Sequence, residues 1–146
     1  MAVKDITPQE AHDLMQKEPD CVYIDVRTAR EFSAGHPQGA VNIPVAFPDP
    51  ARGMVMNQDF AKVVEAYFPR GKKIIVGCQA GPRSDAAARL LGEAGYQDVS
   101  SMQGGFGGMR DPFGSVVTPG WSSLGLPVSQ ENGEGVSYDS LAAKIK

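Results

Sequence analysis

The chain has 146 residues, enough for one domain with its own hydrophobic core, and it is 42% hydrophobic and 21% charged. Its formal net charge of -3 offers nucleic acid no basic surface, and no apolar run approaches the ~20 residues that a membrane-spanning helix needs. The first residues also lack the apolar core of a signal peptide. We therefore expect a soluble, cytoplasmic protein with no nucleic-acid partner and no membrane partner.

The first part of the chain repeats one pattern, an extended segment followed by the start of a helix. Residues 3–6 and 21–26 predict strands, the second being rich in β-branched and aromatic residues. A Thr-x-x-Glu capping box follows each strand, at Thr7 to Glu10 and at Thr28 to Glu31, and predicts a helix start. Gly35 is expected to end the second of these helices.

Further strands and helices alternate up to about residue 102. Two prolines and a glycine within residues 45–57 argue against a regular element, so this stretch is expected to be an irregular loop. The other expected elements are a strand at 40–43, a helix from 58 to 67, a strand at 74–77, a helix from 83 to 94 and a strand at 98–102. This alternation predicts an α/β fold with three layers (α/β/α) around a five-stranded, mostly parallel sheet.

The pattern loosens after Gly105. Residues 113–121 are expected to form a surface loop, and residues 129–135 a polar, flexible spacer. Ser137 is expected to cap a last short helix. We therefore divide the chain into one domain at 1–128 and a polar spacer with a short C-terminal helix at 129–146.

Cys78 is the strongest candidate for chemistry. It ends the strand expected at 74–77, and the ligands of parallel sheets bind beyond the carboxyl ends of the strands. The N-terminus of the next helix and the Arg83 side chain would both place positive charge beside the sulfur, which favours the thiolate. Cys21 has no such neighbours and is interpreted as a small buried hydrophobe. With two cysteines and two histidines, the chain offers no metal-binding pattern.

Several ordered motifs make the chain resemble the rhodanese-like domains, and most closely the small single-domain sulfurtransferases of bacteria and plants. The resemblance runs from about Ile6 to Val128 and so covers most of the domain expected at 1–128. The motifs are Tyr-Ile-Asp-Val-Arg at 23–27, Gly-Ala-Val-Asn-Ile-Pro at 39–44, Ile-Val-Gly-Cys-Gln-Ala-Gly-Pro-Arg-Ser at 75–84, Gly-Gly-Phe at 104–106 and Gly-Leu-Pro-Val at 125–128.

The resemblance implies a sulfurtransferase that works through a covalent persulfide and needs neither a metal nor an organic cofactor. Cys78 would take the sulfane sulfur of a donor such as thiosulfate or a persulfide, and would pass it to cyanide, to a thiol or to a protein acceptor. Cys78 and Arg83 would be the catalytic residues, with Asp25 and Arg27 supporting the fold near the site. The loop that binds the substrate or persulfide would comprise Gln79, Ala80, Gly81, Pro82 and Ser84.

The spacing of this loop separates the chain from enzymes that share the topology. Dual-specificity phosphatases and arsenate reductases resemble it but favour a longer loop, Cys-x5-Arg in the phosphatases, which makes room for a phosphate. Cys78 and Arg83 form the shorter Cys-x4-Arg loop, a ring suited to one sulfur atom. A phosphatase or an arsenate reductase is therefore not expected.

Two departures from the family pattern leave an alternative open. Pro82 has no N–H group, so it removes one donor from the loop while stiffening it. Met109 stands where the family often has a tryptophan, and Trp121 follows only after an insertion. The alternative function is a rhodanese-like module that carries sulfur or binds a partner with little thiosulfate turnover.

A few other residues near the motifs have two interpretations. His36 is interpreted as a turn histidine that holds backbone groups rather than as a base. Four apolar residues either line the mouth of the site or cover the core, as apolar loop residues commonly do: Phe47, Met54, Phe106 and Trp121.

Overall fold

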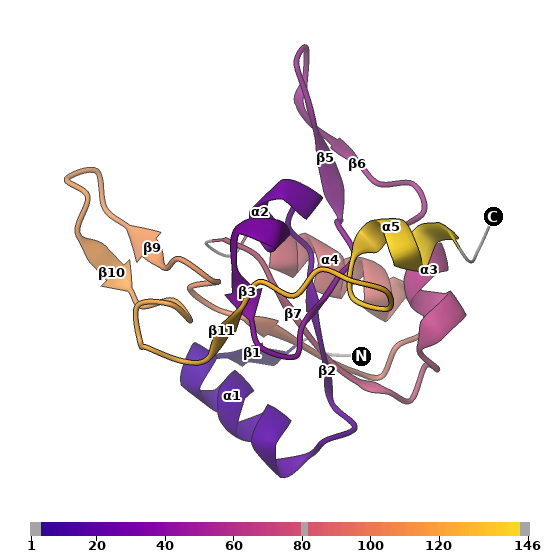
Figure 1. The fold of residues 1–146 in the computed structure, drawn as a ribbon. Helices are drawn as coiled ribbons and strands as arrows, with labels where there is room; N and C mark the ends of the chain where they lie inside the picture. Colours follow the sequence, from indigo (N-terminus) through magenta and orange to yellow (C-terminus); the bar gives the residue numbers. More distant parts are fainter. Residues whose placement is uncertain (1–3, 80–81, 144–146) are drawn as a thin grey trace.

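The centre of the molecule is a parallel sheet of five strands. The computed structural model describes residues 4–79 and 82–143, and Figure 1 shows their arrangement. The strand order is β1-β8-β7-β2-β4, and every neighbouring pair is parallel, which confirms the fold class predicted from the sequence. The strands are β1 (Lys4–Ile6), β8 (Asp98–Met102), β7 (Lys73–Gly77), β2 (Val22–Asp25) and β4 (Val41–Asn42).

Helices cover both faces of this sheet, because successive side chains of each strand point to opposite sides. In β7, Ile74 and Val76 pack in one core cluster and Ile75 in a second one. The first cluster includes side chains of α3 (Phe60–Tyr67), α4 (Pro82–Glu93) and α5 (Tyr138–Ala143), and the second includes those of α1 (Pro8–Lys17) and α2 (Ala29–Ala34). Within the described ranges, no helix is both long and apolar enough to cross a membrane.

Both capping boxes expected from the sequence are present. Thr7 Oγ1 accepts the N–H of Glu10 at 3.1 Å, and Glu10 Oε1 accepts the N–H of Thr7 at 2.9 Å. Thr28 and Glu31 make the same reciprocal pair at the start of α2, which ends at Gly35. These caps satisfy backbone donors that a helix start would otherwise leave without partners.

The expectation of an irregular loop at 45–57 is wrong. The structure has an antiparallel hairpin there, made of β5 (Ala46–Asp49) and β6 (Gly53–Met56), which projects as an arm in Figure 1. Each strand of a two-stranded ribbon has one edge without a partner, so Pro48 can be accommodated despite its missing N–H. Asp49 Oδ1 accepts two N–H groups of the turn at 2.8 and 3.0 Å, and Gly53 takes a positive φ of 79°.

The expectation of a surface loop at 113–121 is also only partly right. Two short strands, β9 (Met109–Arg110) and β10 (Val116–Thr118), pair in a second projecting arm whose tip carries Phe113, 93% exposed. Trp121, by contrast, is only 1% exposed and belongs to the second core cluster. The backbone N–H of Trp121 donates to Gly105 O at 2.9 Å, so the chain returns to Gly105 after the insertion.

The C-terminal segment packs against the domain. The strand β11 (Val128–Ser129) pairs antiparallel with β3 (His36–Pro37). Ser137 Oγ accepts the N–H of Ser140 at 3.3 Å, as expected of a cap for α5. Leu141 is buried in the first core cluster, and Tyr67 donates its hydroxyl to Leu141 O at 2.6 Å. The division of the chain at residue 128 stays a prediction.

Candidate active site

Cys78 lies directly beyond the carboxyl end of the central strand β7 and is 1% exposed. Two glycines allow neighbouring groups to approach it closely. A Cβ at Gly77 would overlap the Tyr23 hydroxyl, and a Cβ at Gly105 would overlap the carbonyl of Cys78. The same carbonyl accepts the N–H of Phe106 at 2.7 Å. The Gly-Gly-Phe motif at 104–106 therefore closes over the backbone of Cys78.

Asp25 and Arg27 form a buried ion pair at the end of the neighbouring strand β2. Asp25 is in register with Gly77, so this pair lies beside the Cys78 segment. Arg27 Nη2 donates to Asp25 Oδ2 at 2.7 Å, Nε donates to Oδ1 at 2.9 Å, and the two side chains are 3% and 1% exposed. A buried charge of this kind is tolerable only when it is paired and hydrogen-bonded.

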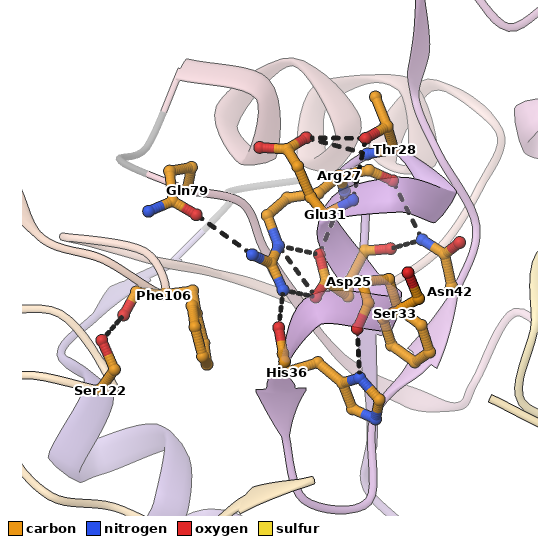
Figure 2. Close-up of polar contacts among 12 residues, drawn as sticks. Asp25, Arg27, Thr28, Glu31, Ser33, His36, Asn42, Gln79, Phe106 and Ser122 are labelled. Carbon is orange, nitrogen blue, oxygen red and sulfur yellow. Dashed lines mark hydrogen bonds and ion pairs between the residues drawn. The ribbon is translucent and has the colours of Figure 1, made fainter. Parts of the chain in front are cut away.

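The Arg27 guanidinium also joins three segments around the site (Figure 2). Nη2 donates to Gly35 O at 2.6 Å, and Nη1 donates to Gln79 Oε1 at 3.1 Å. The guanidinium carbon lies 4.6 Å from the centre of the Phe106 ring. Arg27 thereby connects the end of β2, the end of α2 and the residue after Cys78. These contacts hold the three segments in place around the site.

Asn42 is a site residue that the sequence reasoning missed. It is fully buried, and its Nδ2 donates to Asp25 O and to Arg27 O, both at 3.0 Å (Figure 2). It therefore holds the backbone on either side of the ion pair. The only signal for it in the sequence was its place inside the Gly-Ala-Val-Asn-Ile-Pro motif.

Arg83 does not stand alone at the mouth of the site. Its Nη1 donates to Glu31 Oε1 at 2.7 Å and its Nη2 to Glu31 Oε2 at 3.0 Å, a two-point ion pair across 52 residues of sequence. Glu31 keeps its role in the capping box, since Oε1 also accepts from Thr28 N and Thr28 Oγ1, both at 3.1 Å. The sequence predicted the cap but not this second partner.

The ion pair affects the titration of both side chains. Burial by itself raises the pKa of Glu31, but the hydrogen bonds from Arg83 and Thr28 and the charge of Arg83 lower it from 4.5 to about 2. The hydrogen bond to Glu31 is the main cause that raises the pKa of Arg83 above its ordinary value. Both groups are therefore charged at neutral pH.

The other residues of the loop after Cys78 do not all lie within the part of the chain that the structure describes. Ala80 and Gly81 lie outside the described residues, and Pro82 is the first residue of α4. Ser84 is fully buried, and its Oγ lies 3.0 Å from Ser101 Oγ, which in turn donates to Asp85 Oδ1 at 2.8 Å. The start of α4 is thus anchored to β8.

The structure also distinguishes between the two interpretations given above for His36 and for the apolar residues near the motifs. His36 is 1% exposed, stacks on Phe32 at 3.6 Å and donates from Nδ1 to Phe32 O at 2.7 Å, as expected of a histidine that holds backbone groups. Trp121 covers the core, whereas Phe106 contacts Arg27 at the mouth. Phe47 and Met54 are exposed on the β5–β6 arm, at 38% and 43%.

Two pockets meet at Glu31. One has a volume of about 370 Å³ and is lined by Arg27, Glu31, Ala34, Gly35, Gln79, Phe106, Ser122 and Val128. The other has a volume of about 570 Å³ and is lined by Thr28, Arg30, Glu31, Pro48, Met54 and Arg83. Among the described residues, no group of three or more histidine, cysteine, aspartate or glutamate side chains could hold a metal ion.

The two cysteines are expected to differ in their reaction with iodoacetamide. Burial raises the pKa of Cys21 from 9.0 to about 11, so almost none of this thiol is ionised at neutral pH. We expect the alkylation rate of Cys21 to rise about tenfold per pH unit until the pH nears 11, and Cys78 to react faster than Cys21 at pH 7. Peptide mapping after timed quenching measures both rates. Equal rates at pH 7 would contradict the prediction of an activated thiolate at Cys78.

Comparison with known proteins gives consistent matches. A family model described as a rhodanese-like domain matches residues 7–111. Thiosulfate sulfurtransferase 16, chloroplastic, of Arabidopsis thaliana is 39% identical over 117 residues, which cover 80% of this chain and 85% of that protein. Thiosulfate sulfurtransferase GlpE of Actinobacillus succinogenes is 32% identical over 133 residues, covering 91% and 96%. The crystal structure of Rv0390 from M. tuberculosis is similar with a TM-score of 0.74 and 29% identity, covering 90% of this chain and all of that one.

Proposed function

The chain is a member of the rhodanese-like domain family, and from that premise we propose that it is a sulfurtransferase with Cys78 as its nucleophile. The names of its relatives from Arabidopsis thaliana and Actinobacillus succinogenes support sulfur transfer as the reaction class. The donor is proposed to be thiosulfate or a persulfide. The acceptor is proposed to be cyanide, a thiol or a thiol of a protein.

The proposed reaction has two steps. The Cys78 thiolate attacks the sulfane sulfur of thiosulfate, a new S–S bond forms, and sulfite leaves with the electron pair of the bond that breaks. Cyanide or an acceptor thiolate then attacks the outer sulfur of the Cys78 persulfide, and the thiolate of Cys78 is the leaving group. The negative charge is conserved in each step, so neither step needs an oxidant or a reductant.

One observation carries the proposal: Cys78 stands between the carboxyl end of β7 and the N-terminus of α4, a helix of 12 residues. Such a helix start offers backbone N–H groups and the positive end of the helix dipole to an anion. A thiolate and a persulfide anion are both negatively charged at this place. The proposed roles of Gln79, Ala80 and Gly81 follow from their place in the sequence between these two elements, and those of Pro82 and Ser84 from their place at the start of α4.

The alternative, a module that carries sulfur or binds a partner with little thiosulfate turnover, has less support. The relatives named above are named for thiosulfate sulfurtransferase activity, not for a carrier role. The expected cytoplasmic location stays a prediction, which fractionation of the source cells would check.

The proposal is tested by loading the protein with sulfur. After incubation with thiosulfate and removal of the excess, intact mass spectrometry should show a gain of the mass of one sulfur atom, and peptide mapping should place it at Cys78. Addition of cyanide should remove this mass and release thiocyanate in equal amount. A protein that gains no sulfur, or that gains it at Cys21, would contradict the proposal.

A further inference from the structure

Each of the two guanidinium groups beside the proposed nucleophile has a carboxylate partner. Arg27 is paired with Asp25 in the interior, and Arg83 is paired with Glu31 at the surface of the mouth. The Arg83 and Glu31 side chains are 25% and 32% exposed, so this second pair faces an arriving donor. Neither guanidinium therefore presents an uncompensated positive charge.

The Glu31 carboxylate is held firmly in this place. Its two oxygens accept hydrogen bonds from both terminal nitrogens of Arg83, and Oε1 also accepts from the backbone and the hydroxyl of Thr28. With a pKa lowered to about 2, this carboxylate stays negative throughout the neutral range. It lines both of the pockets described above, one beside Gln79 and one beside Arg83, so a ligand in either pocket lies close to it.

The electrostatic effect of the Glu31 carboxylate on a sulfur donor depends on the charge that the donor carries. Gln79, the residue after Cys78, lines the same pocket as Glu31, so a donor that approaches Cys78 through this pocket also approaches the Arg83–Glu31 pair. Glu31 cancels the attraction that Arg83 alone would exert on an anionic donor. Because that attraction is proportional to the charge of the donor, thiosulfate, a dianion, loses twice as much of it as a donor with one charge. At a partly exposed position, the additional unit charge of the donor is expected to cost about a factor of ten in kcat/KM.

We propose that Glu31 is a specificity-determining residue, which disfavours dianionic thiosulfate relative to sulfane donors that carry a single negative charge. Thiosulfonates and simple alkyl persulfides are donors of this second class. The inference rests on the proposed sulfurtransferase function and narrows its donor class. Glu31 acts through charge and through Arg83, and it takes no part in bond making or breaking.

The test compares two donors with one acceptor. Thiosulfate and benzenethiosulfonate carry two charges and one charge, and with cyanide as acceptor both yield thiocyanate, so a single assay measures kcat/KM for each. We expect Glu31→Gln to raise the ratio of kcat/KM for thiosulfate to that for benzenethiosulfonate about tenfold. Because the pair is partly exposed, this gain should shrink as the ionic strength is raised from about 0.01 M to about 1 M, where the Debye length falls to about 3 Å.

The control variants separate charge from structure. Glutamine can take the place of glutamate in a capping box, so Glu31→Gln should keep α2 intact, and thermal melting checks this. Glu31→Asp keeps the charge and should keep the donor ratio of the parent, whereas Glu31→Ala removes the charge with a different side chain and should raise the ratio. Glu65→Gln removes a carboxylate of α3 that pairs with the exposed Arg70, and it should leave the ratio unchanged.

The outcomes distinguish a failure of the proposed sulfurtransferase function from a failure of the proposed specificity role of Glu31. If the parent protein releases thiocyanate from neither donor, the proposed function fails. If it uses both donors but Glu31→Gln and Glu31→Ala change both kcat/KM values by the same factor, or leave them unchanged, Glu31 does not determine specificity and the sulfurtransferase proposal stands.

Discussion

Replacement of Cys78 by serine is expected to lower the rate of thiocyanate formation by roughly a thousandfold or more, since loss of a covalent nucleophile has effects of this size. A serine hydroxyl in this place would neither ionise at neutral pH nor form a persulfide. The side chain is 1% exposed and serine is smaller than cysteine, so the fold should survive the change. The measurement combines steady-state turnover with the mass of the protein after incubation with thiosulfate, and the variant should gain no sulfur.

Cys21→Ser is the matched control for this experiment. Cys21 precedes β2 at the opposite end of that strand from Asp25, and its pKa of about 11 keeps it protonated at neutral pH. We expect this variant to load sulfur and to turn over as the parent does. Turnover by Cys78→Ser at the rate of the parent would show that another group is the nucleophile and would overturn the site assignment.

Arg27→Met is expected to have the largest effect on stability, a loss of about 3–5 kcal/mol in the free energy of unfolding. The substitution leaves the buried Asp25 carboxylate without its ion-pair partner and leaves the carbonyl of Gly35 without the donor at 2.6 Å. It also removes the hydrogen bond to Gln79, so the residue after Cys78 loses its connection to β2. Urea unfolding followed by circular dichroism measures the free energy.

Arg70→Met provides a control in which the same change breaks an exposed pair. Arg70 and Glu65 are 59% and 36% exposed at their side chains, and exposed ion pairs contribute little to stability. We expect this variant to lose no more than about 1 kcal/mol. A similar loss in both variants would mean that the ion pair of Arg27 with Asp25 does not brace the domain as its burial suggests.

The elements that the sequence predicted well are those with local signals. Both capping boxes consist of contacts three residues apart, so Thr7 with Glu10 and Thr28 with Glu31 are recognisable without any tertiary structure. The continuous apolar run at residues 74–76 of β7 likewise predicts a strand buried on both faces. The alternation of strands and helices predicted the parallel sheet and the position of Cys78 at the carboxyl end of its strand, and the family resemblance then added the expected reaction.

The two hairpins were missed because their stability does not depend on local propensity. Pro48 is unfavourable in the middle of a sheet but is tolerated in a ribbon of two strands, where each strand has an open edge, and Pro50 lies in the turn between the strands. The insertion before Trp121 looked like surface, yet it returns the chain to Gly105 and buries the indole. The burial of Trp121 depends on Gly105, which lies 16 positions earlier in the sequence, so no local pattern predicts it.

The sequence by itself was sufficient for the strands of the central sheet, the helix starts and the choice of Cys78, because each rests on a pattern within about ten residues. Only the tertiary structure revealed that Glu31 neutralises Arg83, that Asn42 holds the backbone around the ion pair, and that Arg27 reaches Gln79. Two of these contacts join residues 52 positions apart. They arise because parallel strands bring their carboxyl ends to one edge of the sheet, where charges with no relation in the sequence must find partners.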